Sequence, residues 1–307
     1  MNILKGILYK LASALMFAVM SALVRFAGET IPVGQVVFFR SAFAIVPVVV
    51  IYTLTRQLRG AVYTTRPFGH VGRGTLGAAG MFLSFGALAR LPLADVTVIS
   101  FASPLITVAL AALLLKERVR IYRWSAVTIG FLGVLVMLAP HLDAARIGGH
   151  TPAETVGAVL ALISAFCNAG AVIQTRRLVD TETTSSIVFY FSLVCAIVSA
   201  LTLPFDWKTP DGVVLAALIG TGVLGGLAHL LLTESYRHAP ASLVAPFDYT
   251  AILWAFVLGY AMFGEIPSHL VFIGAGIIVV TGLFVLWRER QLGLRRPRAA
   301  EGPPTGA

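Results

Sequence analysis

Charged side chains are scarce in this chain. They make up 12% of its 307 residues, whereas 58% are apolar. A soluble domain needs a charged and polar surface, so this composition excludes an ordinary soluble fold. A helical membrane span needs about 20 apolar residues, and ten spans would use roughly 200 of them. The remainder suffices for short loops and a tail, which excludes a separate soluble catalytic domain.

Cysteine is almost absent as well. Cys167 and Cys195 are the two in the sequence, and both lie in apolar stretches without a CxxC spacing. This spacing excludes a disulfide framework and gives no support to a zinc site. We interpret both as small core residues and expect no metal.

Catalytic motifs are missing too. The chain has no HExxH, no GxSxG elbow and no Walker loop, so we expect neither an enzyme nor a transporter that itself binds ATP. Gly220–Gly225 (GTGVLG) matches the dinucleotide fingerprint in letters, but that motif binds a pyrophosphate only between a strand and a helix. Here it lies in an apolar run. We interpret its glycines, like Gly74, Gly77 and Gly80, as positions where helices pack closely, and we expect no cofactor.

The chain contains two copies of one pattern. Gly6–Arg25 aligns without gaps on Gly157–Arg176, and the same offset places Phe38 on Phe189 and Ser41 on Ser192. Later in each copy, Pro92 matches Pro240 and Glu117 matches Glu265. If each copy spans the bilayer five times, the second copy is inverted. Inverted repeats of this kind form a binding site near the membrane midplane.

Positive charge is distributed unevenly. The net charge of +9 would suit nucleic acid, but most lysines and arginines fall in alternate loops or near the ends, so we expect no nucleic-acid partner. The positive-inside rule then places both termini in the cytoplasm, in a multi-pass protein of the inner membrane. Ten spans fit this pattern, at 5–26, 33–54, 71–90, 94–115, 121–139, 154–175, 185–204, 212–234, 242–263 and 268–287.

The fold class we expect is therefore an all-α polytopic membrane protein, with ten transmembrane helices in two inverted five-helix repeats. The first repeat covers residues 1–140 and the second covers 154–290. Residues 291–307 are polar and rich in proline, and we expect them to form a disordered cytoplasmic tail.

Charges inside the expected spans are candidates for function, because an arginine near a helix centre costs about 2.5–3.5 kcal/mol on insertion scales. Arg40 lies in the second span and Asp248 in the ninth. In one interpretation Arg40 pairs with Asp248 or with backbone carbonyls and locks the bundle. In the other, one or both contact substrate or titrate during transport. Lys10 and Arg25 lie near span ends, where we expect them to snorkel to the interface.

Helix interruptions and polar groups indicate where a substrate path would lie. Pro104 and Pro246 interrupt the fourth and ninth spans, and broken helices line the path in many carriers. A buried Asn or His needs a hydrogen-bond partner, and an unperturbed His titrates near neutrality. The substrate-binding candidates are Arg40, Ser100, Asn168, Tyr190, His229, Asp248 and Tyr249.

Several short motifs resemble a known family. In the first copy they are Leu91–Asp95 (LPLAD), Ser100–Pro104 (SFASP) and Leu115–Arg118 (LKER). The corresponding motifs of the second copy are Ala239–Ser242 (APAS), Ala245–Tyr249 (APFDY) and Phe263–Glu265 (FGE). Together they resemble the EamA family of the drug/metabolite transporter superfamily. The resemblance covers about residues 1–290 and implies ten helices in two inverted halves, with a cavity between spans 1–4 and 6–9.

Within the family the chain looks most like bacterial riboflavin transporters. The shared stretches are Arg66–Gly74 (RPFGHVGRG), Ile187–Ser192 (IVFYFS), Ala245–Tyr249 and Trp287–Arg290 (WRER). This resemblance implies riboflavin uptake by alternating access, and a flavin ring suits stacking between Phe and Tyr side chains. Relatives that move S-adenosylmethionine or amino acids, inward or outward, look broadly similar and stay an alternative, with Asp248 then facing the cation of S-adenosylmethionine. A non-transporting intramembrane enzyme or scaffold is the remote alternative.

Overall fold

The computed structural model describes residues 3–54, 56, 60, 62–114, 120–142, 152–178, 181–239 and 241–291, and within these it is helical. The expected tail and the matching residues Glu117 and Pro240 lie outside the described residues. The first repeat contains α1 (Ile3–Gly28), α2 (Val33–Leu54), α4 (Pro67–Leu88), α5 (Leu93–Ser100), α6 (Ala102–Leu114) and α7 (Ile121–Leu142). The second contains α8 (Pro152–Leu178), α9 (Thr184–Ala200), α10 (Leu203–Asp206), α11 (Gly212–His238), α12 (Ala241–Val244), the 3₁₀ helix η2 (Ala245–Tyr249), α13 (Thr250–Phe263) and α14 (His269–Gln291).

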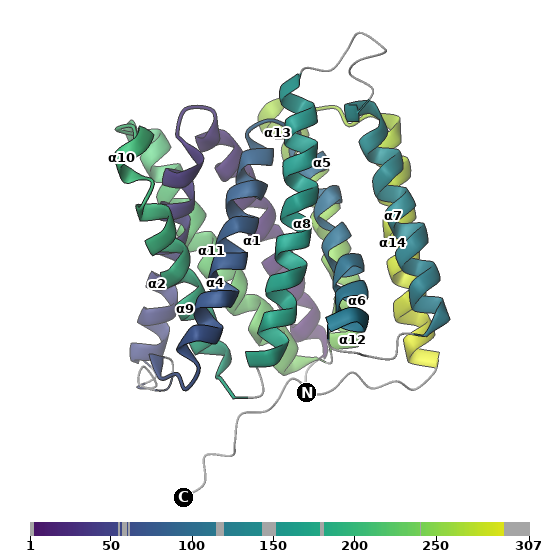
Figure 1. Cartoon of the computed structure of the whole chain (residues 1–307), viewed down its shortest axis with the longest axis horizontal. Helices are drawn as coiled ribbons and strands as arrows, with labels where there is room; N and C mark the ends of the chain where they lie inside the picture. Colours follow the sequence, from purple (N-terminus) through teal and green to yellow (C-terminus); the bar gives the residue numbers. More distant parts are fainter. Residues whose placement is uncertain are drawn as a thin grey trace, which may run out of the picture.

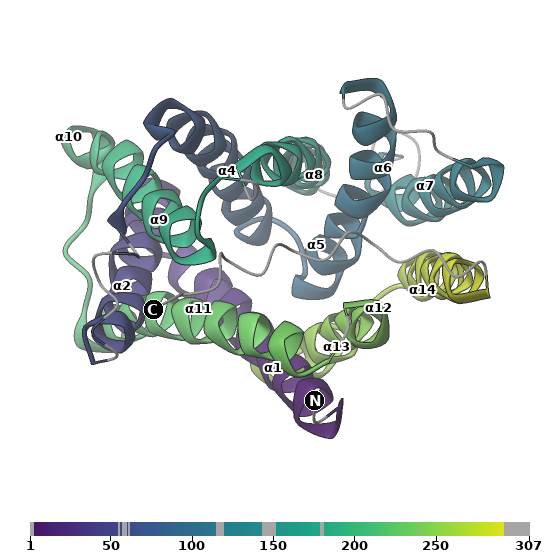
Figure 2. The ribbon, with the colours of Figure 1, turned by 90° about the horizontal axis from the view of Figure 1, so that it is seen from below.

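The two repeats are inverted and interlocked. In Figure 1, α1 rises from the N-terminal end whereas its counterpart α8 descends. The packing has the matching symmetry, because α1 contacts α11 as α8 contacts α4, and α2 contacts α11 as α9 contacts α4. Counterparts also pack on each other, α2 on α9 and α7 on α14 (Figure 2). The described ends of α1 and α14 lie at the same end of the bundle, as an even number of crossings requires.

Nine helical segments among the described residues are long and apolar enough to cross a membrane. The long helix outside that set is α4, whose 22 residues include several glycines, His70 and Arg73. It begins at Pro67, earlier than the expected start at residue 71, because proline is well suited to the first turn of a helix. With α4 as the tenth crossing, the predicted ten-helix, two-repeat fold is confirmed.

Both expected helix interruptions occur. In the first repeat, α5 ends at Ser100, Phe101 forms a turn, and α6 carries Pro104 in its first turn. In the second, α12 gives way to η2, which contains Pro246, before α13 begins. A proline lacks the N–H that would bond to the carbonyl four residues earlier, so the helix cannot continue regularly. The two breaks meet in space, because Phe101 stacks on Tyr249 with ring centroids 5.2 Å apart.

Glycines bring the helices of the two repeats together, as the sequence predicts. A Cβ added to Gly74 would lie 2.6 Å from Val194 Cβ, and one added to Gly77 would overlap Phe191. On α11, a Cβ at Gly222 would overlap Phe43, and one at Gly226 would lie 2.5 Å from Pro47 Cγ. The fingerprint-like glycines of α11 therefore act in helix packing.

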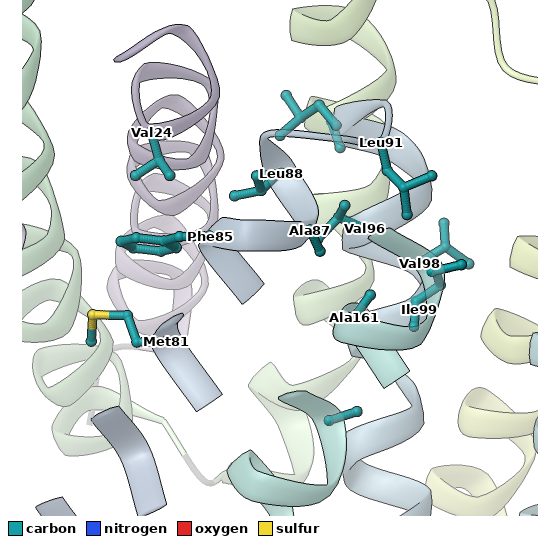
Figure 3. Close-up of a cluster of buried hydrophobic side chains, with 14 of the residues drawn as sticks. Val24, Met81, Phe85, Ala87, Leu88, Leu91, Val96, Val98, Ile99 and Ala161 are labelled. Atoms are coloured by element: carbon teal, nitrogen blue, oxygen red, sulfur yellow. The ribbon is translucent and has the colours of Figure 1, made fainter. Parts of the chain in front are cut away.

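A cluster of buried apolar side chains lies toward one end of the bundle. Figure 3 shows Val24 of α1 facing Phe85 and Leu88 of α4, with Val96 and Ile99 of α5 alongside. These residues belong to the last turns of α1 and α4 and to the α5 helix that follows, so they lie toward the end opposite the start of α1. This cluster joins α1, α4 and α5 at that end of the bundle.

Candidate functional site

Two arginines converge on one aromatic ring in the interior of the bundle. Arg40 lies on α2 and Arg73 on α4, and both guanidinium groups lie over Phe191 of α9, with Cζ 5.9 Å and 3.9 Å from the ring centroid. Arg40 is only 5% exposed. A cation over an aromatic face gains about 2 kcal/mol when water is excluded. The ring therefore holds the two cations together without neutralising either.

His229 of α11 completes what we call the arginine cluster: Arg40, Arg73, Phe191 and His229. Its Nε2 lies 3.5 Å from Arg40 Nη2, and its ring meets that of Phe17 edge-on with centroids 4.9 Å apart. Arginine only donates, so the contact favours a neutral imidazole whose Nε2 accepts. The cluster contains two cations and no acidic side chain.

Several donors of the two arginines lack a hydrogen-bond partner within the described part of the chain. They are Nε and Nη1 of Arg40 and Nη1 of Arg73, all of them buried. Arg73 Nε donates to Thr175 Oγ1 at 3.2 Å. Unpaired buried donors are rare in native proteins, and each costs about 1–3 kcal/mol. These donors point to an acceptor that the described residues do not supply.

Asp248 pairs with Lys10, in place of the Arg40 partner that one interpretation of the sequence suggested. Lys10 Nζ lies 2.6 Å from Asp248 Oδ1, donates to Tyr236 Oη at 3.3 Å, and is 5.2 Å from that ring's centroid. Lys10 is 2% exposed and the Asp248 side chain is half-exposed. The expected snorkelling of Lys10 is therefore wrong, because η2 presents a carboxylate to it inside the bundle.

Arg25 does not snorkel either. It forms an ion pair with Glu265 in the loop after α13, and it donates to the backbone oxygens of Leu88, at 3.1 Å, and Leu91. Glu265 also accepts from the N–H of Leu93 at 2.8 Å. Burial raises the pKa of Glu265, although Leu93 and Arg25 oppose this effect. The network joins the end of α1, the α4–α5 turn and the second repeat beside the apolar core.

A second link between the repeats lies at the other end of the bundle. Glu182, in the α8–α9 loop, accepts at Oε1 from the N–H and hydroxyl of Thr65, both at 2.8 Å, and from the Arg66 N–H at 3.0 Å. His70 Nε2 lies 3.3 Å from Glu182 Oε2. We call these residues the Glu182 clasp. Burial would raise the pKa of Glu182, but the bonds from Thr65 and His70 outweigh it and lower the pKa to about 2.

The seven candidate residues do not form a single group. Arg40 and His229 meet in the arginine cluster, whereas Asp248 and Tyr249 lie at η2. Ser100 ends α5 next to Phe101, and its hydroxyl donates to the carbonyl of Thr97 at 2.6 Å. Tyr190 belongs with the Glu182 clasp, since its ring lies 4.7 Å from that of His70 and its hydroxyl donates to Val62 O at 2.8 Å. Asn168 packs against Gly80, where an added Cβ would lie 2.6 Å from Oδ1.

Sequence reasoning missed Arg73 and Phe191. Arg73 lies at the start of the expected span 71–90, so its position near the span end gave no reason to place it at a site. A signal for Phe191 was present in the repeat alignment, since the match of Ser41 with Ser192 also places Arg40 on Phe191. Equivalent positions of the two repeats face each other across the symmetry axis, which is why these two side chains touch.

A separate apolar pocket of about 340 Å³ lies on α1, α11 and α13, lined by Leu23, Phe26, Val213, Ala216, Ala217 and Met262. Its lining offers no polar group to orient a substrate. Across the residues that the structure describes, no group of three or more His, Cys, Asp or Glu side chains is placed to hold a metal ion. The chemistry of the interior is therefore that of the arginine cluster and the ion pairs.

Inverted five-helix repeats, broken helices that meet at the centre and buried charges between them define a multi-pass membrane transporter. Comparison with known proteins gives the family. The model of the EamA-like transporter family matches residues 4–139 and 155–287, so the chain belongs to the EamA-like transporter family.

The chain is similar along nearly its whole length to transporters with different names. It is 32% identical to an S-adenosylmethionine uptake transporter of Rickettsia prowazekii over 94% of both chains. It is 32% identical to a pseudopaline exporter of Pseudomonas aeruginosa, over 93% of this chain and 97% of the relative. It is 30% identical to a riboflavin transporter of Vibrio cholerae, over 97% of this chain and 98% of the relative.

A solved crystal structure has the same fold. It superposes with a TM-score of 0.64 at 21% identity, covering 94% of this chain and 98% of its own. At this identity the likeness concerns the fold alone.

Proposed function

We propose that this protein is a secondary transporter that moves a small organic metabolite across the cytoplasmic membrane by alternating access. The observation that carries the proposal is the meeting of the two broken helices at Phe101 and Tyr249, which are equivalent residues of the two repeats. Helix breaks that meet on the symmetry axis let the repeats rock about a central site. The networks at Glu265 and Glu182 link the repeats at opposite ends of the bundle, where such rocking would make and break contacts.

Two substrate candidates follow. The first is S-adenosylmethionine or a related amino acid, which the relative from Rickettsia and the cationic interior support. Asp248 is an unsuitable partner for a substrate cation in this conformation, because Lys10 already occupies it. The second is riboflavin uptake, which the relative from Vibrio and the stacked rings of Phe101 and Tyr249 support.

Uptake assays separate the candidates. The purified chain is reconstituted in proteoliposomes, and labelled S-adenosylmethionine, tryptophan and riboflavin are supplied in turn, with a competitor present or absent. In parallel, the gene is expressed in a riboflavin auxotroph that lacks its own importer. Uptake of none of these compounds would reject the proposed substrate classes, and absence of growth rescue would remove riboflavin.

Orientation is the other part of the proposal. We propose that the repeats at 1–140 and 154–290 are inserted in the inner membrane with both termini in the cytoplasm, as the distribution of lysine and arginine favours. Reporter fusions at each terminus test this, and activity of a periplasmic reporter at either end would refute it.

A further inference from the structure

We propose that the arginine cluster binds a carboxylate group of the transported metabolite. This inference rests on the proposed transport function and adds the chemical class of the substrate, a small acid or amino acid. An uncharged vitamin or a purely cationic compound would leave the two guanidinium groups unpaired.

Two other basic residues of the interior, Lys10 and Arg25, have partners of a different kind from those of Arg40 and Arg73. Lys10 has a carboxylate and a tyrosine hydroxyl, and Arg25 has a carboxylate and two backbone oxygens. Among the described residues, Arg40 and Arg73 instead contact an imidazole nitrogen, a threonine hydroxyl and an aromatic face, and neither forms an ion pair with a carboxylate. Arg25 Nε is also unpaired, but both Lys10 and Arg25 have a carboxylate partner, as expected of charges that merely lock helices together.

The unused donors match the acceptors of a carboxylate. Three buried donor nitrogens from two arginines are available, and an ionised carboxylate has two oxygens with about four acceptor sites. Hydrogen bonds between arginine and a carboxylate are among the strongest in proteins, because donor and acceptor are both charged. The two cations also favour an anion electrostatically where lipid and protein exclude water.

The position of the cluster suits a transported ligand. Its four residues come from α2 and α4 of the first repeat and from α9 and α11 of the second. Arg40 and Phe191 are equivalent positions of the two repeats, so the cluster lies beside the symmetry axis. A ligand bound there contacts both repeats and can remain bound while they move relative to each other.

Binding is tested with pairs of compounds that differ in the carboxylate alone. The full-length protein in detergent is titrated with S-adenosylmethionine and its decarboxylated counterpart, and with tryptophan and tryptamine, while its melting temperature is followed. We expect at least one acid to raise the melting temperature and its partner to bind at least tenfold more weakly. Equal binding of both members of every pair, or binding of no acid, overturns the proposal.

Variants assign the effect to the cluster. Arg40→Gln and Arg73→Gln are each expected to weaken binding of the acid about tenfold to a hundredfold, the usual worth of a hydrogen bond between charged groups. Arg288→Gln is the control, because this arginine lies at the end of α14 and donates to Gln291 Oε1 on the surface. Unchanged affinity in both cluster variants overturns the proposal.

The ligand-free protein provides a second readout. Removing the Arg40 charge also removes unpaired donors, so Arg40→Gln should melt at the same temperature as the parent or higher. A clear fall would indicate a structural lock and would overturn the proposal. If Arg40→Gln still transports the acid at the parent rate, the carboxylate subsite is rejected while the transport function stands. If the parent transports none of the compounds, the substrate classes of the proposed function are rejected.

Discussion

Replacing Glu182 with glutamine tests whether one carboxylate holds the two repeats together at the end of the bundle where α4 begins. The side chain of Arg66, the N-cap residue of α4, makes no capping hydrogen bond. Glu182 approaches this helix start from the α8–α9 loop and accepts three bonds at Oε1, of 2.8 and 2.8 Å from Thr65 and 3.0 Å from the Arg66 N–H. A carboxylate at this position also interacts favourably with the helix dipole.

The magnitude can be obtained in two ways. A hydrogen bond to a charged group contributes about 1 kcal/mol more than a neutral one, so three of them give about 3 kcal/mol. The pKa falls from 4.5 to about 2 in the folded protein, which also corresponds to about 3 kcal/mol. Because the folded pKa is depressed, this stabilisation is fully present above about pH 4.5 and is lost as the pH falls toward 2. Glutamine carries no charge at any pH and should lose it throughout.

The assay is thermal unfolding of the purified protein in detergent at several pH values between 7 and 3. At pH 7 we expect Glu182→Gln to melt about 6–10 °C below the parent, on the scale for chains of this size. The difference should shrink at pH 3, where the parent carboxylate begins to protonate. His70 also faces the carboxylate, so His70→Gln is run beside it as a control for imidazole titration. A gap between parent and Glu182→Gln that is the same at pH 7 and pH 3 would refute the reasoning.

Three further predictions concern packing and charge. Gly77→Ala should lose about 1–3 kcal/mol of stability in the same melting assay, because the added methyl group overlaps Phe191. Gly72→Ala is the control and should be neutral or slightly stabilising, because nothing lies within 4 Å of its new methyl group. Equal losses in the two variants would contradict the packing. Arg25→Gln leaves the buried Glu265 without its ion-pair partner and should cost about 3–5 kcal/mol, part of which Arg25→Gln/Glu265→Gln should restore; strictly additive losses in this double-mutant cycle would show that the pair is not coupled. If Asp248 couples protons to transport, Asp248→Asn should abolish accumulation in proteoliposomes yet preserve exchange, and accumulation equal to that of the parent would exclude that role.

The sequence by itself determined the fold class and the symmetry. A helix that crosses a membrane satisfies its own backbone, so apolar length and the prolines and glycines between runs suffice to locate it. The two copies were visible because equivalent helices need the same residues at close contacts, as the glycines of α4 and α11 show. Helix α4 was the weakest of these predictions, because close packing required glycines in place of large apolar residues.

The tertiary structure decided which charges meet. Sequence shows that a charge in a span is expensive, but its partner lies on another helix, and the rotation of each helix depends on how glycines and bulky side chains fit together. Lys10 therefore forms an ion pair with Asp248, from the other repeat, and Arg25 forms one with Glu265, although both basic side chains were expected to reach the membrane–water interface. Arg40 and Arg73 form no ion pair with a carboxylate among the described residues. They converge on Phe191 because α2 and α4 both pack against α9.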